Sequence, residues 1–167
     1  MKSLIVIGCG AHGRIVAEAA AASHRVLGFA DDNAARHATR VDDWPVLGAW
    51  VELEADEFIV AIGDNAARAR LFSAVRASGR MMAKVVAPGA WVSKRAELGA
   101  GTVVLAGAVV QAGARVGVNV LLNAGCVVDH DAVIGDHAHV APGAVVASFG
   151  VVAPSEWLRA GEVRMRN

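Results

Sequence analysis

The chain places an aliphatic residue at every sixth position from residue 86 to residue 158. This register is unbroken, and each position holds Val, Leu or Ile. The positions are Val86, Val92, Leu98, Val104, Val110, Val116, Leu122, Val128, Ile134, Val140, Val146, Val152 and Leu158. A period of six matches neither the 3.6-residue turn of an α-helix nor the two-residue alternation of a strand. It is typical of a solenoid in which short strands stack in successive coils.

A second column of mostly small residues follows four positions after each aliphatic one. Alanine fills much of it, as at Ala90, Ala108 and Ala144, and Glu156 is its one charged member. An aliphatic side chain can fill a corner of a narrow prism, while a small residue lets the backbone turn there without crowding. The two columns predict a left-handed parallel β-helix of hexapeptide repeats over residues 85–167.

Composition and charge agree with this fold and narrow the choice of partners. Hydrophobic residues make up 55% of the chain and aromatic residues 5%, which suits stacked coils of Val, Ala and Gly. The formal net charge is zero and the Lys and Arg residues are scattered. We therefore expect no nucleic-acid partner and no anionic membrane partner.

The start of the chain and its cysteines bear on its location. No apolar run is long enough for a transmembrane helix, and Met1–Ser3 leads directly into a strand rather than a secretory leader, which predicts a cytoplasmic protein. Cys9 and Cys126 fall in different structural units and predict no disulfide. Cys126 belongs to the small-residue column and is expected to be a packed thiol.

Residues 1–84 alternate strand and helix signals and predict a small, parallel, Rossmann-like α/β domain. An apolar run at residues 3–7 leads through the motif GCGAHG at residues 8–13 into an alanine-rich helical stretch. Further strands are expected at 25–30 and 58–62. Asp64 or Asn65 should cap a helix that ends near Ser78.

The glycine motif predicts a binding turn between strand and helix. Gly8, Gly10 and Gly13 permit a tight turn, and the helix N-terminus offers free N–H groups to a phosphate. Asp31 and Asp32 at the end of the second strand could accept hydrogen bonds from a ribose or a base. This domain has room for one mononucleotide half, which favours a mononucleotide or a nucleotide-sugar over a dinucleotide. Alternatively, the glycines serve only close packing of strand and helix.

His12 lies inside this motif and has two interpretations. Its imidazole could pack beside the start of the helix, or it could face the phosphate- or sugar-binding turn. The sequence leaves both open.

Three of the six histidines, His130, His137 and His139, fall within ten residues of the repeat. A metal site is one interpretation, but the spacing differs from the His-x4-His pattern of carbonic anhydrases with this fold, and we expect no metal. A solvated outer strand face is another, and it suits Asp136. The third is general base catalysis, in which His130 takes a proton from an acceptor amine or hydroxyl. Asp131 or Asp129 would fix its tautomer. We favour the third.

With both halves in view, the sequence resembles the nucleotide-sugar acetyltransferases. These include sialic acid O-acetyltransferase-like proteins and the bacterial UDP-amino-sugar and GDP-perosamine N-acetyltransferases. The resemblance runs from residue 1 to about residue 147. It rests on GCGAHG at 8–13, the Asp31–Asp32 pair, AIGDN at 61–65, Asn123-x-Gly125, and DHDAVIGDHAHVAPG at 129–143.

The resemblance implies a homotrimer with active sites between neighbouring β-helices, and direct transfer of acetyl from acetyl-CoA to a sugar amine or hydroxyl. His130 matches the family's catalytic base, Asp131 the acidic residue that orients it, and His139 a second histidine near the thioester. The N–H of Ser148 is the candidate donor to the thioester oxygen. The residues that match the nucleotide-sugar site are Gly8, Gly10, His12, Gly13, Asp31, Asp32, Gly63 and Asn65.

The chain departs from the family after residue 143. It has Ser148–Phe149 where the family has a Gly-Gly pair, and Val152–Ala153 and Leu158–Arg159 where isoleucine-glycine steps are expected. It ends at Asn167, before the family's further coils, and residues 156–167 are expected to form a covering tail. A second hypothesis follows: a shortened homologue that binds a nucleotide-sugar or a partner enzyme without acetyl transfer.

Overall fold

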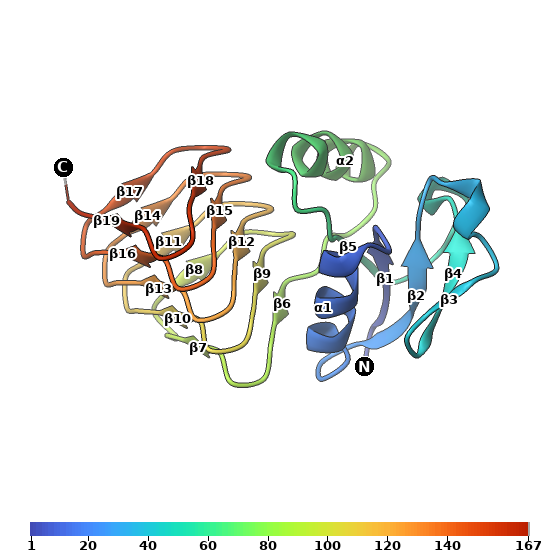
Figure 1. The fold of residues 1–167 in the computed structure, drawn as a ribbon, viewed down its shortest axis with the longest axis horizontal. Helices are drawn as coiled ribbons and strands as arrows, with labels where there is room; N and C mark the ends of the chain where they lie inside the picture. The colour runs from blue at the N-terminus through green and yellow to red at the C-terminus, as the bar shows by residue number, and fades with distance from the viewer. Residues whose placement is uncertain (167) are drawn as a thin grey trace.

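The computed structural model describes residues 1–166, which form an α/β unit beside a three-sided prism of stacked coils (Figure 1). The α/β unit contains the N-terminus, and the coils rise away from it toward the C-terminus. This is the predicted architecture of a Rossmann-like unit followed by a left-handed β-helix.

The α/β unit is built on a five-stranded sheet in the order β3-β4-β2-β1-β5. Pairing is parallel except between β3 and β4. Every residue of β1 is buried, which explains its continuous apolar run. Its elements are β1 (Ser3–Ile7), α1 (Ala11–Ala20), β2 (Arg25–Ala30), η1 (Ala34–Arg36), β3 (Arg40–Val41), β4 (Trp44–Gly48), η2 (Trp50–Glu52), β5 (Glu57–Val60) and α2 (Asn65–Ala77).

Each side of the prism is a parallel sheet of two-residue strands. Val109 pairs with Val127, 18 residues later, so three hexapeptides close one coil. The sheets are β6-β9-β12-β15-β18, β7-β10-β13-β16-β19 and β8-β11-β14-β17, called here the first, second and third sheets. Their strands are β6 (Val85–Val86), β7 (Trp91–Val92), β8 (Glu97–Leu98), β9 (Val103–Val104), β10 (Val109–Val110), β11 (Arg115–Val116), β12 (Leu121–Leu122), β13 (Val127–Val128), β14 (Val133–Ile134), β15 (His139–Val140), β16 (Val145–Val146), β17 (Val151–Val152), β18 (Trp157–Leu158) and β19 (Val163–Arg164).

The aliphatic column fills the prism from Val104 to Leu158, where every member is buried. The first coil differs, because no further coil covers it. Val92 and Leu98 are only partly buried, and Val86 is 37% exposed. The prediction that Val86 fills an inner corner of the prism is therefore wrong, because Val86 is not buried.

The prism continues through the stretch that was expected to be a covering tail. β18 pairs with β15, β19 pairs with β16, and Leu158 is fully buried. Glu156 does not disrupt its coil, because its carboxylate stays outside, accepts a hydrogen bond from the N–H of Ala153 and pairs with Arg164. The expectation of a tail is thus wrong for residues 156–164, and Asn167 lies outside the described residues.

The α/β unit covers the lower part of the first sheet. The outward residues Val85, Val103 and Leu121 are buried with the apolar side of α1 in one cluster. Higher up the same column, His139 and Trp157 follow in register, and Trp157 is 61% exposed. The upper end of this sheet is therefore available to a ligand. None of the helices in residues 1–166 is long and apolar enough to cross a membrane.

Candidate active site

The glycine motif forms the floor of a cleft of about 430 Å³ at the carboxyl edge of the α/β sheet. Gly8, Gly10, His12, Asp31 and Gly63 all line it, as the sequence predicts. Parallel strands place their ends at the same edge, which is why residues from three loops meet here. Asn33 and Arg36 of the η1 segment also line the cleft, and the sequence reasoning did not identify them.

Gly13 has a packing role instead. A Cβ atom at Gly13 would collide with the carbonyl oxygen of Gly8, so α1 could not approach β1 as closely as it does. Gly13 is buried against Phe29 rather than open to the cleft. For this one glycine, the close-packing alternative describes the structure.

Asp31 is held by protein donors. Its Oδ2 accepts from the backbone N–H of Cys9 at 3.2 Å and from the Cys9 thiol at 3.0 Å, and its Oδ1 accepts from the N–H of Asn33 at 3.0 Å. Burial opposes ionisation, but these hydrogen bonds prevail and lower the pKa of Asp31. Asp31 therefore fastens the glycine loop to the second strand. Asp32 instead lines a separate hollow beside α2.

A second cleft, of about 490 Å³, lies between the start of α2 and the upper end of the first sheet. Its lining includes Gly63, Asn65, His139 and Trp157. Gly63 also lines the glycine-loop cleft, so the two clefts are adjacent there. Together they connect the α/β unit to the prism.

His139 enters this cleft as a neutral imidazole. The Asn123 amide donates to its Nε2 at 3.2 Å, and the amide is oriented because its Oδ1 accepts from the N–H of Ala124. The ring proton must then reside on Nδ1. Trp157 stacks on the ring at 5.9 Å, and burial lowers the pKa of His139 to about 4. Burial likewise lowers the pKa of His12 to about 4.

Arg68 joins the two halves of the molecule, and the sequence reasoning missed it. It is 2% exposed and donates to the carbonyls of Ile62 and Gly63 in the α/β unit and to those of Asn119, His137 and Ala138 in the prism. Desolvation lowers its pKa to about 10. Arg68, Phe72 and Val75 form the buried side of α2. An arginine at helical spacing with two apolar residues was the available signal.

Asn65 extends this connection. Its amide nitrogen donates to the carbonyls of Ser155 and Glu156, and its Oδ1 accepts from Arg68. Asp64 precedes it as the N-cap of α2 and accepts from the N–H of Ala67. The predicted cap is confirmed, and Asn65 holds the cleft together as well as lining it.

His130 and Asp131 lie in a different corner, the turn between β13 and β14. The Nδ1–H of His130 donates to Asp131 Oδ2 at 2.8 Å, which leaves Nε2 as a proton acceptor. This bond, reinforced by the charge of Asp129, raises the pKa of His130. The other oxygen of Asp131 lies where a side chain at position 113 would be, so Gly113 makes room for the carboxylate.

Ser148 and Phe149 form the equivalent turn one coil above His130. The N–H of Phe149 donates to the carbonyl of His130 at 3.2 Å, and the two rings meet edge to face with centroids 5.4 Å apart. Ser148 is half-buried beside them. The expected oxyanion donor thus lies in the turn stacked on that of the expected base.

The structure does not bring the three clustered histidines together. His130 is in the turn after β13, His139 is on β15, and the Nδ1 of His137 is paired with the amide of Asn119 at 2.9 Å. Over residues 1–166, no three His, Cys, Asp or Glu side chains gather as metal ligands would. These positions give no support to the metal-site interpretation.

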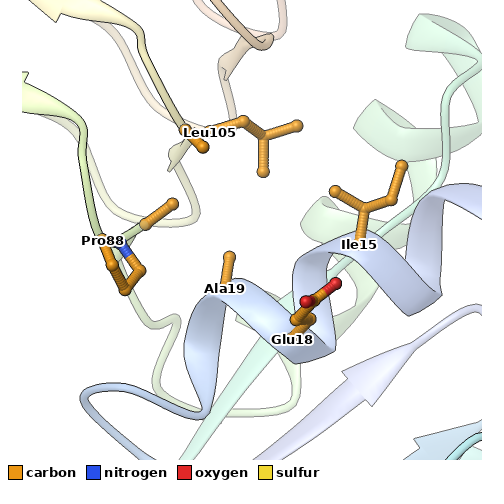
Figure 2. Close-up of a pocket in the computed structure, with 7 residues that line it drawn as sticks. Ile15, Glu18, Ala19, Pro88 and Leu105 are labelled. Carbon is orange, nitrogen blue, oxygen red and sulfur yellow. The ribbon is translucent and has the colours of Figure 1, made fainter.

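A further groove of about 290 Å³ separates α1 from the first coils of the prism (Figure 2). Ile15 and Ala19 of α1 face Pro88 and Leu105 across it, with Glu18 at its edge. Its lining is mostly apolar and offers one ionisable group, so it lacks the acid–base pairing found at His130.

Two family descriptions match the chain. The PglD N-terminal domain matches residues 3–75, and the six-repeat bacterial transferase hexapeptide matches residues 113–148. No curated protein matches the sequence.

Solved structures resemble the whole chain. The acetyltransferase domain of PglB from Neisseria gonorrhoeae FA1090, in complex with acetyl coenzyme A, is 32% identical, with a TM-score of 0.89 over 96% of this chain and 80% of that one. PerB from Caulobacter crescentus, in complex with CoA and GDP-perosamine, is 26% identical, with a TM-score of 0.69 over 97% and 91%. WeeI from Acinetobacter baumannii AYE shares the fold at 18% identity, with a TM-score of 0.59 over 96% and 94%. By its two domain matches and its identity to the Neisseria domain, the chain belongs to the hexapeptide-repeat nucleotide-sugar acetyltransferases and is an acyltransferase.

Proposed function

We propose that this protein transfers acetyl from acetyl-CoA to an amine or hydroxyl of a nucleotide-linked sugar, with His130 as general base. The observation that carries the proposal is the 2.8 Å bond from His130 Nδ1 to Asp131, which leaves Nε2 ready to accept a proton. The relatives complexed with acetyl-CoA, and with CoA and GDP-perosamine, support this substrate pair.

The proposed step is direct. The acceptor nitrogen or oxygen attacks the thioester carbonyl, and His130 Nε2 takes the proton that this atom loses. The carbon–sulfur bond then breaks, and the imidazolium returns the proton to the departing CoA thiolate. Asp131 stabilises the imidazolium between the two transfers. The Ser148 N–H is the proposed donor to the carbonyl oxygen.

We propose that the nucleotide-sugar occupies the two adjacent clefts at Gly63. In the glycine-loop cleft, His12 and the start of α1 would receive the phosphates. The sugar would extend toward His139 and Trp157. In this arrangement, Asp31 holds the glycine loop in place, and Gly13 allows α1 to approach β1 closely beside the cleft.

A homotrimer completes this site. His130 lies in the corner between the second and third sheets, whereas His139 is on the first sheet, so one chain does not bring base and sugar cleft together. The second sheet also presents an outward apolar column of Trp91, Val109, Val127, Val145 and Val163, which the α/β unit does not cover. An exposed apolar column of this kind favours contact with the β-helix of another subunit.

Replacement of His130 tests the proposal. His130→Ala should lower kcat by about 100-fold or more, because general base catalysis contributes that much. CoA thiol release with GDP-perosamine and a panel of UDP- and GDP-linked amino sugars measures it, and ultracentrifugation checks assembly. His24→Ala, on the far side of the α/β unit, is the control. Full activity of His130→Ala contradicts the assignment of the base.

The competing function is sugar binding without transfer, which is favoured by the bulky Phe149 where the family has glycine. Calorimetry separates the two. Acetyl transfer requires that the wild-type protein bind both acetyl-CoA and a nucleotide-sugar, whereas binding of the sugar alone would favour the competing function.

Both proposed substrates, acetyl-CoA and the nucleotide-sugar, carry phosphates and cross membranes poorly. This supports a cytoplasmic location, which we also propose.

A further inference from the structure

Three residues in the prism corner that holds His130 have a left-handed backbone conformation. Gly113, Asp131 and Phe149 follow one another at intervals of 18 residues, all in the corner between the second and third sheets, with φ of 76°, 58° and 60°. Glycine adopts this conformation freely, whereas a bulky residue is strained in it. Phe149 is therefore a backbone outlier, and such outliers are concentrated at functional sites.

Phe149 contacts the proposed base through both its backbone and its ring. Its N–H donates to the carbonyl of His130, and its ring meets the imidazole at 85° with centroids 5.4 Å apart. This edge-to-face arrangement is a favourable one for aromatic pairs. Phe149 is nevertheless 47% exposed, so burial alone does not explain a large apolar residue there.

Arg166 holds the ring in turn. Its guanidinium carbon lies 4.9 Å from the centroid of the Phe149 ring, within the range of a cation–π contact. Phe149 thus contacts His130 on one side and Arg166 on the other. The charged groups around the imidazole are Asp129 and Asp131 on its own turn, and Arg166 lies on the other side of the phenyl ring.

His130 needs such a second contact. Its side chain is 51% exposed, and within residues 1–166 its imidazole has one side-chain hydrogen bond, to Asp131. One hydrogen bond fixes the tautomer but leaves the ring free to tilt about that bond. We propose that Phe149 is a positioning residue, and that it holds the imidazole so that Nε2 points to the acceptor, with Arg166 securing the phenyl ring. This inference rests on the proposed role of His130.

Phe149→Gly tests the inference, because it removes the ring and also relieves the strained backbone. We expect kcat to fall about 10- to 100-fold, the loss typical of a misplaced catalytic group. KM for both substrates should stay within about twofold, since Phe149 acts on the base rather than on binding. The melting temperature should hold or rise. Phe149→Leu, which keeps apolar bulk without a ring, covers the case in which the glycine variant folds poorly.

The control for backbone relief is Ala38→Gly. Ala38 is exposed, has a φ of 60° and lies in the α/β unit, so the exchange relieves the same kind of strain far from His130. It should leave kcat unchanged. Phe149→Tyr, which retains the aromatic ring, should keep most of the wild-type kcat that Phe149→Gly and Phe149→Leu lose.

Two measurements distinguish a role of Phe149 in positioning His130 from a purely structural role. NMR of the His130 imidazole should show the ring-current shift from Phe149 in the wild type and its loss, with broadening, in Phe149→Leu. In a His130→Ala background, Phe149→Leu should cost nothing further, because there is no base left to position. Unchanged kcat in both Phe149→Gly and Phe149→Leu, or an equal loss from Phe149→Leu in the His130→Ala background, overturns the inference. Full activity of His130→Ala alone would instead overturn the proposed function.

Discussion

At the scale of single residues, the site depends on how one carboxylate is placed. Asp131 accepts from His130 with one oxygen, while its other oxygen occupies space that Gly113 leaves open one coil below. The turn therefore presents an imidazole with a fixed tautomer and a raised pKa. The motif around His130 predicted the pairing. It could not predict the roles of Gly113 and Phe149, because these residues are 18 positions before and after Asp131 in the chain.

Asp131→Asn should move the acid limb of the pH–rate profile to lower pH. The carboxylate stabilises the imidazolium, so without it the proton leaves more readily and the pKa of His130 falls toward its ordinary value. The rate at the optimum should fall by about 10-fold or more, because the ring loses its tautomer anchor. The profile of kcat/KM measures both effects. Asp136→Asn is the matched control, since Asp136 accepts from a backbone N–H at another corner. An unmoved acid limb would count against Asp131 as the partner of the base.

At the scale of elements, the six-residue period predicted the prism well because each corner needs one aliphatic and one small residue. It failed at both ends for different reasons. Val86 has no coil beneath it, and the polar Glu156 suggested a tail where an ion pair with Arg164 keeps the coil intact. For α2, local spacing signals that Arg68 faces inward, but it does not identify the partners of Arg68, because their carbonyls are more than 50 residues away.

Arg68→Met should lower the free energy of unfolding by about 3 kcal/mol, because it leaves several buried carbonyls without donors. Chemical denaturation measures this loss. We also expect weaker nucleotide-sugar binding, since the second cleft depends on the placement of α2. Arg70→Met, on the exposed side of the same helix, is the control and should change neither quantity. Equal stability of the two variants would show that Arg68 does not join the halves.

At the scale of the whole molecule, two half-buried histidines link stability to pH. His12 comes from the α/β unit and His139 from the prism, and the charge of Arg68 adds to the burial that keeps both neutral. Their pKa values are about 4 in the folded protein, below the ordinary 6.5. Between these values the unfolded chain binds more protons, so stability falls as pH decreases through this window.

The melting temperature should therefore decline from about pH 6.5 toward pH 4, and His139→Gln should reduce the decline. Glutamine keeps a polar group for Asn123 but has no proton to gain. Calorimetric scans of both proteins across this range measure the difference. The same slope in both would mean that His139 does not contribute.

The closed coil of 18 residues has a consequence for how the enzyme can be altered. An insertion of one residue between Asp131 and Phe149 would turn every later side chain to another face and carry the phenyl ring away from the base. An insertion of one whole coil above residue 164 would lengthen the prism and leave the contacts among residues 1–164 in place, although Arg166 would move away from Phe149. Length in this protein is therefore modular, and viable insertions and deletions should come in whole coils.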